Sequence, residues 1–297
     1  MAKHPRKMTQ TPEVMRRRLR VALREARDAA GLTQRVAAEQ LDWSVSKIIR
    51  IEQGASAITP VDLRALLAIY RVTDKEQVEE LVELARGSKK QSWAEYKEVY
   101  SSASLNLFGS EAAAKTIYKY EPEFVPGLLQ TQEYAQALLT GLGQPERHVE
   151  LMVNARIERQ ELLDREPQPD LSFVIGEAAL SRAVGGPRVM LRQLERLREL
   201  GARAGISLQV LPFSAGAHPH IGGAFTILQF ADENLDDLLY LENAGGERTV
   251  RDEPEILADY YETFARLEGM ATNPNDFANA LERIEAQRFK DTADPLT

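Results

Sequence analysis

The chain contains no cysteine among its 297 residues. This absence excludes disulfide bonds and metal sites built on thiolates, and it fits a reducing compartment. No apolar run approaches the roughly 20 residues that a membrane-spanning helix needs. The first thirteen residues, MAKHPRKMTQTPE, lack the apolar centre of a signal peptide. We therefore expect a cytoplasmic protein with no membrane partner.

The sequence also lacks the common signatures of catalysis and cofactor binding. It has no HExxH or GxSxG motif, and its paired glycines lack the spacing of either phosphate-binding fingerprint. The glycine pairs at 185–186 and 245–246 are therefore predicted to be turns. We predict no catalytic residue, no resident metal and no cofactor, and the chain is not expected to be an enzyme.

The segment His218-Pro219-His220 is the best candidate for a metal site. In an extended segment, side chains two residues apart share a face, so both imidazoles could reach one ion. No third ligand is fixed by the spacing, and a rigid loop is the favoured interpretation. One alternative remains open: an enzyme fused to a DNA-binding domain, acting through residues 216–223 with acids such as Glu177 or Glu242.

Charge is distributed unevenly along the chain. The net charge is −8, but residues 1–58 hold 12 lysines and arginines against 6 acidic residues. Residues 59–297 hold 25 against 39, an acidic excess of 14. A basic head and an acidic body are typical of a DNA-binding module attached to a body that avoids phosphate.

The most informative segment lies between Thr33 and Gly54. Thr33 is suited to cap a short helix that ends near Leu41, because its side-chain oxygen accepts a first-turn N–H group. Ser44 is suited in the same way to cap a second helix, which ends before Gly54. Only a tight turn fits between them, and Asp42 tolerates the left-handed backbone of such a corner. Two short helices at a steep angle place the second one in a DNA major groove.

The second of these helices supplies the predicted base contacts. Ile48 and Ile51 are three residues apart and should face the first helix. The opposite side then carries the residues that we expect to contact DNA, with Arg50 able to fork onto guanine. Glu52 is expected to pair within the domain, because a groove acid would repel phosphate. The predicted DNA-binding residues are Gln34, for a phosphate, and Ser44, Val45, Ser46, Lys47 and Arg50.

This segment resembles the helix-turn-helix of the xenobiotic-response-element and phage-repressor family. Ala37, Asp42 and Trp43 depart from the usual leucine, glycine and valine, and the volume lost at Ala37 is regained at Trp43. The resemblance also implies base contacts at Val45, Ser46 and Arg50. It is carried by Gly31-Leu32-Thr33-Gln34 and by Ala38, Leu41, Ser44, Ile48, Ile51, Glu52 and Gly54.

The domain organisation follows from the helix pattern and the polar breaks. Residues 1–13 are predicted to be a flexible basic arm, and residues 14–87 an all-α helix-turn-helix domain of five helices. Thr59-Pro60 and Thr73-Asp74 have the composition of helix starts. A linker at 87–91 precedes a body at 92–288, and residues 289–297 are predicted to be a flexible tail. Two interpretations of the arginines on the first helix, contact with the DNA backbone and a solvated surface, are equally favoured. These arginines are Arg16, Arg17, Arg18, Arg20 and Arg24.

The body is predicted to be a mixed α+β domain with one small sheet. Short apolar runs with β-branched or aromatic residues predict strands at 171–175, 206–211, 225–230 and 238–242. Helices are predicted at 111–120, 131–141, 145–165, 187–204, 253–270 and 274–287. Aromatic residues after the linker are expected either to pack in the core or to form a ligand or partner site. These aromatic residues are Trp93, Tyr96, Tyr100 and Phe108.

The body also resembles the C-terminal domain of a class of actinobacterial regulators described as antitoxin-like. The phrases that carry the resemblance begin at Tyr120, Arg156, Glu177 and Gln209. Genes of this class often neighbour one for a small protein thought to bind the regulator. The resemblance implies transcriptional control. We expect a repressor-like homodimer on a double-stranded DNA operator of the nucleoid, because one module of this size buries too little surface for tight binding. The body is expected to dimerise and to receive a small partner protein or effector. A protein that mainly sequesters its partner is a second alternative.

Overall fold

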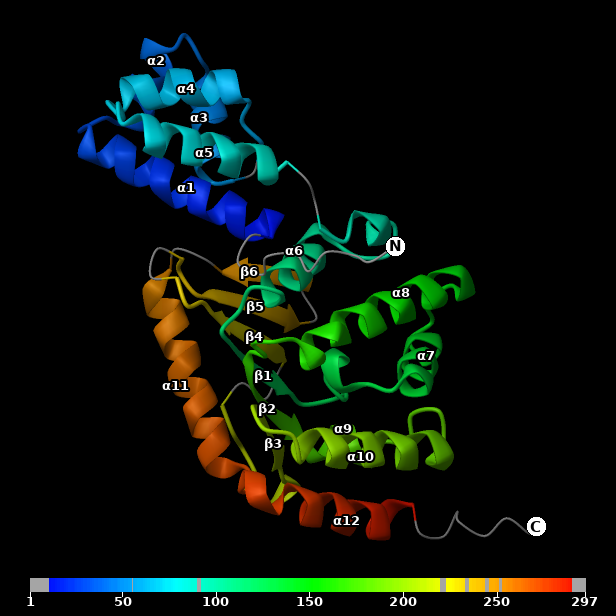
Figure 1. Cartoon of the computed structure of the whole chain (residues 1–297). Helices are drawn as coiled ribbons and strands as arrows, with labels where there is room; N and C mark the ends of the chain where they lie inside the picture. The colour runs from blue at the N-terminus through cyan, green and yellow to red at the C-terminus, as the bar shows by residue number, and fades with distance from the viewer. Residues whose placement is uncertain are drawn as a thin grey trace. The chain divides into compact units, whose positions relative to one another are not determined.

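The computed structural model of the chain describes residues 11–54, 56–89, 92–219, 223–232, 235–243, 246–250 and 253–289 (Figure 1). The chain forms two compact units. The first contains the residues up to Ala94, with Phe108–Ala113 and Ala231–Leu235, and the second contains Glu95–Leu107, Ala114–Phe230 and the residues from Asp236 onward. Most of the predicted arm and tail lies outside the described residues.

The helices of the first unit begin at capping side chains. Thr11, Thr33, Ser44 and Thr59 each accept a hydrogen bond from a backbone N–H in the first turn that follows. The fifth helix is capped by Asp74, which accepts from Gln77 N, within the predicted helix start at Thr73-Asp74. The five helices are α1 (Pro12–Ala29), α2 (Gln34–Gln40), α3 (Val45–Glu52), α4 (Pro60–Ile69) and α5 (Lys75–Gly87).

A single apolar core joins these five helices. Asp42 has a φ of 53°, which confirms the left-handed corner between α2 and α3. Ala37 is completely buried there, and the larger Trp43 packs against the same core. The buried members of this core include Leu19, Leu23, Ala38, Ile48, Ile51, Leu63, Leu66, Leu67, Leu81 and Val82.

The second unit is built on a six-stranded sheet in the order β3-β2-β1-β4-β5-β6. The first three strands are parallel to one another, and β4, β5 and β6 follow as antiparallel neighbours. A mixed sheet with helices on both faces agrees with the predicted α+β body. The strands are β1 (Thr116–Glu121), β2 (Asp170–Gly176), β3 (Ile206–Leu211), β4 (Ala224–Gln229), β5 (Leu238–Asn243) and β6 (Gly246–Val250).

Helices lie on both sides of this sheet (Figure 1). The face towards α11 is apolar, and Tyr120, Phe225 and Leu239 pack there against Phe264 and Leu267. The crossover helices between the parallel strands lie on the other side. The helices of this unit are α7 (Gln132–Gly141), α8 (Glu146–Arg159), α9 (Glu177–Ser181), α10 (Pro187–Gly201), α11 (Pro254–Met270) and α12 (Phe277–Arg288), and α6 (Ser102–Glu111) belongs to it as far as Leu107.

Two strands differ from the sequence prediction. The predicted helix at 111–120 is wrong, because α6 ends at Glu111 and residues 116–121 form β1, which lies between β2 and β4. The segment TIYKYE is rich in β-branched and aromatic residues, and pairing with both β2 and β4 decides its conformation. The strand β6 was not predicted, since its two ends are glycine-rich or polar.

The aromatic residues after the linker are used inside the fold. Trp93 meets Phe108 edge-on with ring centroids 5.8 Å apart, within the first unit. In the second unit, Tyr96 donates to Glu158 at 2.8 Å and Tyr100 donates to the Met152 carbonyl at 3.2 Å. Packing therefore accounts for them. In the described part of the chain, no helix is long and apolar enough to cross a bilayer.

Candidate nucleic-acid interface

The helix α3 has one buried and one exposed face. Ile48 is fully buried and Ile51 is 5% exposed, so both lie in the domain core. Val45 is 38% exposed, and Ser46 and Arg50 are exposed as well. This arrangement confirms which side of α3 is available to a partner. A guanidinium, a hydroxyl and a small apolar side chain are the groups that read base edges in a major groove.

Lys47 is held at the side of this face. Its ammonium group lies 3.5 Å from the centroid of the Trp43 ring and 3.2 Å from Asp62 Oδ2. The side chains of Lys47 and Asp62 are each about one-third exposed. An ion pair exposed to this extent is weak, so a phosphate can compete with Asp62 for the lysine. Its contact with DNA remains a prediction.

Ser44 has a structural task and a spare donor. Its Oγ accepts a hydrogen bond from Lys47 N at 3.2 Å, which satisfies the first turn of α3. A serine hydroxyl can accept and donate at once. While it caps α3, the hydroxyl can still donate its proton to a phosphate oxygen. The predicted role of Ser44 is therefore compatible with its position.

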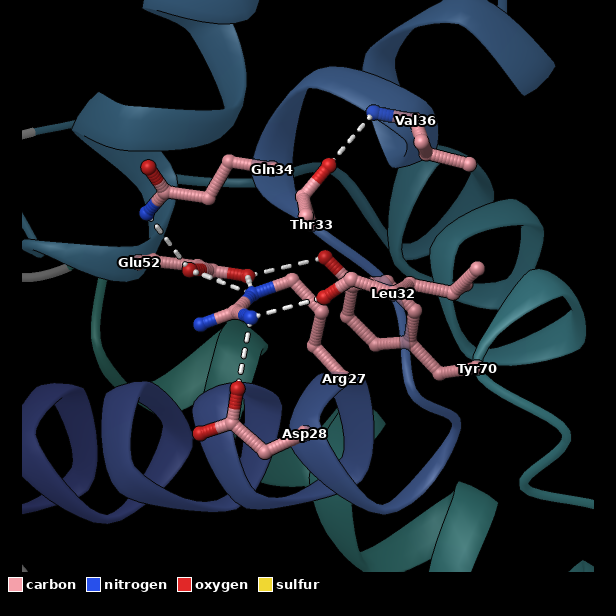
Figure 2. Close-up of polar contacts among 8 residues, drawn as sticks. All are labelled: Arg27, Asp28, Leu32, Thr33, Gln34, Val36, Glu52 and Tyr70. Atoms are coloured by element: carbon pink, nitrogen blue, oxygen red, sulfur yellow. Dashed lines mark hydrogen bonds and ion pairs between the residues drawn. The ribbon is translucent and has the colours of Figure 1, made fainter.

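Gln34 is engaged within the domain. Its side-chain Nε2 donates to Glu52 Oε2 at 2.8 Å (Figure 2). The Nε2 group carries a second N–H, which can still donate to a phosphate. The backbone N–H groups at the start of α2 point outward as at any helix N-terminus and are further donors for a phosphate. The DNA contact of Gln34 remains a prediction.

A buried carboxylate organises the support for this interface. Glu52 is 1% exposed and confirms the expectation that it pairs within the domain. Arg27 Nε donates to its two oxygens at 2.8 and 3.1 Å, and Tyr70 donates to Oε1 at 2.8 Å. Together with Gln34, these donors come from α1, α2 and the end of α4, and Figure 2 shows them converging on Glu52.

The electrostatics of this cluster favour its charged and hydrogen-bonded form. Burial and the hydrogen bond to Glu52 raise the pKa of Tyr70 far above its ordinary value. Its hydroxyl therefore stays protonated and remains a donor. Burial alone would lower the pKa of Arg27, but the hydrogen bond and charge of Glu52 outweigh it and the pKa rises. The guanidinium also donates to the Leu32 carbonyl at 2.9 Å, which fixes the connection into α2.

The arginines of α1 divide differently from the expectation. Arg17 and Arg20 are 3% and 5% exposed and belong to the interior of the first unit. Arg16 donates to the Ser88 carbonyl at 2.9 Å, which joins α1 to the end of α5. Arg24 is exposed. Most of the basic charge on this helix therefore has a structural role.

The described residues of the glycine-bounded loop hold their polar groups in local contacts. His218 Nδ1 lies 3.0 Å from the Pro219 carbonyl, and its ring meets the edge of Tyr120. Glu177 accepts a hydrogen bond from Phe213 N at 2.7 Å and so anchors the loop. His220 lies outside the described residues. Among those described, no group of three or more His, Asp or Glu side chains could hold a metal ion.

Sequence reasoning missed the partners of Glu52. Arg27 and Tyr70 are 25 and 18 residues away from it along the chain, so no local spacing indicates the contact. The available signal was indirect: an acid in an otherwise apolar turn of α3 requires donors from neighbouring helices.

The fold and this surface define a helix-turn-helix DNA-binding regulator. A family model for a helix-turn-helix domain matches residues 18–81. A second model, described as a domain of unknown function (DUF5753), matches residues 106–283, more than half of the chain. The chain therefore belongs to the DUF5753 family. No curated protein and no solved structure matches the chain.

The Glu52 cluster predicts a stability difference between two glutamates. Glu52→Gln removes the charge that balances the half-buried Arg27. It also places an amide N–H group among the donors of Arg27, Gln34 and Tyr70. We therefore expect a loss of about 3 kcal/mol in unfolding free energy. Glu39→Gln removes an exposed pair with Arg35 and should cost less than about 0.5 kcal/mol. Denaturant unfolding followed by Trp43 fluorescence in a Trp93→Phe background measures both. Equal effects of the two substitutions would contradict the central role of Glu52.

Proposed function

We propose that this protein is a sequence-specific transcription regulator of the xenobiotic-response-element type. It binds a double-stranded operator through α3, and its body dimerises and receives a signal. The observation that carries the proposal is the division of α3. Ile48, Ile51 and Glu52 fix the helix within its domain, while Val45, Ser46 and Arg50 remain exposed on the opposite face. Packing within the domain does not explain why Arg50 and Val45 lie on that exposed surface.

The charge distribution supports the same proposal. The basic excess lies in the first 58 residues, and the acidic excess of the remainder disfavours further contact with phosphate. The body therefore contributes something other than DNA contact. We propose binding rather than catalysis, since the loop at 213–219 holds its histidine and Glu177 in structural hydrogen bonds.

Arg50 tests the base-reading surface. Arg50→Ala should weaken operator binding by about 1–3 kcal/mol and relax the preference at one base pair, because the forked guanidinium is lost. Arg50→Lys keeps the charge without the fork, so it should retain non-specific binding and lose the preference. Electrophoretic shifts on the operator and on single-site variants measure both.

A matched control is Arg86→Ala on α5, where the arginine is half exposed and paired with Glu83. It should leave the base preference unchanged. A folded Arg50→Ala protein with unaltered operator affinity would remove Arg50 from the base-reading set and leave the operator role of α3 without its strongest contact.

The proposed operator is an inverted repeat. A single module of this size buries too little surface for tight binding, so two copies are needed, with half-sites about 10 bp apart along one face of the duplex. Sedimentation of the complex and footprinting on the promoter should show two protomers and two protected half-sites. A monomer that protects one half-site with full affinity would contradict dimeric recognition.

The signal is proposed to be the small protein encoded by a neighbouring gene, as the antitoxin-like resemblance implies. Binding of this protein can alter DNA affinity only if it prefers one state of the regulator. Titrating it into the regulator–operator complex should change the operator affinity. A partner that binds without any change would favour the sequestering alternative, and one that fails to bind would leave a small-molecule effector as the signal.

A further inference from the structure

A row of polar side chains crosses the face of the sheet opposite α11. Thr226 on β4 is paired directly with Lys119 on β1 and with Tyr240 on β5. Opposed residues of antiparallel strands point to the same side, so these three side chains are neighbours. The other residues of β4 on this face, Ala224 and Leu228, are apolar, and a charge beside them therefore needs an explanation.

Lys119 lies between two carboxylates. Its Nζ is 2.9 Å from Glu242 Oε2 and 3.4 Å from Glu121 Oε2. The side chains of Lys119 and Glu121 are 13% and 14% exposed, whereas that of Glu242 is 43% exposed. The cluster is therefore closed at Lys119 and opens to solvent at Glu242.

The charges of this cluster shift one another's pKa values. Lys119 is the main cause that holds the pKa of Glu242 below its ordinary value, with Arg159 and Arg156 of α8 adding to it. Burial raises the pKa of Glu121, so its negative charge is the less firmly held. Burial also disfavours the charge on Lys119, but Glu242 and Glu121 outweigh this effect and the pKa of Lys119 rises. Lys119 thus contacts two carboxylates, and Arg156 and Arg159 add positive potential at Glu242 in a body that is acidic as a whole.

The inner end of the cluster contains an unused hydroxyl. Thr226 is 1% exposed, and its Oγ1 has no hydrogen-bond partner among the described residues. A buried hydroxyl without a partner costs about 1–3 kcal/mol, and a valine of the same shape would avoid that cost. Lys119 and its carboxylates are also a costly way to fill a sheet face, since well-packed apolar residues usually serve stability as well.

The cluster lies at a characteristic position in the sheet. The chain proceeds from β1 to β2 and β3 on one side, while β4 lies on the other side of β1. Glu121 ends β1, and Glu242 is near the end of β5, which runs parallel to β1 because two antiparallel pairings separate them. Ligands of open parallel sheets bind at the carboxyl ends of strands; here β4 is antiparallel to β1, and it is β1 and β5 that end at this edge.

We propose that this cluster is a binding site for a small organic carboxylate. The ligand's carboxylate takes the place of Glu242 beside Lys119, its approach is favoured by Arg156 and Arg159, and its inner end hydrogen-bonds Thr226. Glu242 itself demonstrates that a carboxylate fits against the lysine. The site lies entirely within the second unit, and it is independent of any DNA contact made by the first.

Succinate is the probe for this site, with succinamide as its neutral counterpart and sodium chloride at equal ionic strength as the salt control. Titration into the full-length protein, followed by the thermal unfolding midpoint and by calorimetry, should show saturable binding of succinate alone. Inorganic phosphate separates a carboxylate site from a general anion site. Binding of phosphate without succinate, or of neither, would overturn the proposal.

Substitution of Glu242 gives a gain of binding that a misfolded protein cannot imitate. Glu242→Gln removes the internal competitor and should tighten succinate binding about fivefold. Glu282→Gln on α12 makes the same charge change on an exposed surface and should have no effect. Equal affinity in the two variants would show that Glu242 does not occupy the ligand's place.

Two further variants test the other end of the site. Lys119→Met should abolish succinate binding. Because this substitution also leaves two carboxylates unpaired, Thr226→Val provides a second variant that should fold as well as the natural protein. It should weaken succinate binding about tenfold through the lost hydrogen bond. Succinate affinity that is unchanged in folded Thr226→Val would mean that the ligand does not reach this hydroxyl and would overturn the proposed site.

Discussion

The first unit depends on one buried carboxylate. Glu52 accepts hydrogen bonds from Arg27 on α1, Gln34 on α2 and Tyr70 at the end of α4, and it belongs to α3 itself. Short helices such as α2 and α3 are not stable by themselves, so their mutual angles must come from tertiary contacts. Apolar packing brings them together, but it tolerates small rotations. Directional bonds to a single carboxylate restrict those rotations and fix the exposed face of α3.

This constraint explains how a seven-residue helix and an eight-residue helix can hold the proposed base-reading groups in a defined orientation. The side chains on the exposed face make little contribution to folding. The identities of Arg50 and Ser46 are therefore not set by the core, while Ile48, Ile51 and Glu52 are determined by the domain. The same separation explains why Gln34 is ambiguous, since it lies at the boundary and its amide serves Glu52.

Local signals predicted the first unit well, and pairing between distant strands accounts for most errors in the second. Helix caps at Thr33, Ser44 and Thr59 are encoded within four residues, and the left-handed corner at Asp42 follows from one side chain. The strand β1 was predicted to be helical because its conformation depends on β2, more than 50 residues away. For the same reason the neighbours of Lys119 could not be predicted, since Glu242 is adjacent to it only through β4.

The two units place charge inside the fold in different ways. Around Glu52, every carboxylate oxygen has a donor, the donors are buried or half-buried, and the arrangement serves rigidity. Around Lys119, one carboxylate is buried, the other is nearly half exposed, and a buried hydroxyl is left without a partner. A network that only stabilises a fold has no reason to leave a donor unused beside an exchangeable ion pair. Incomplete satisfaction of buried polar groups therefore distinguishes the body's cluster from a structural one, and it agrees with a body whose contribution is to bind something other than DNA.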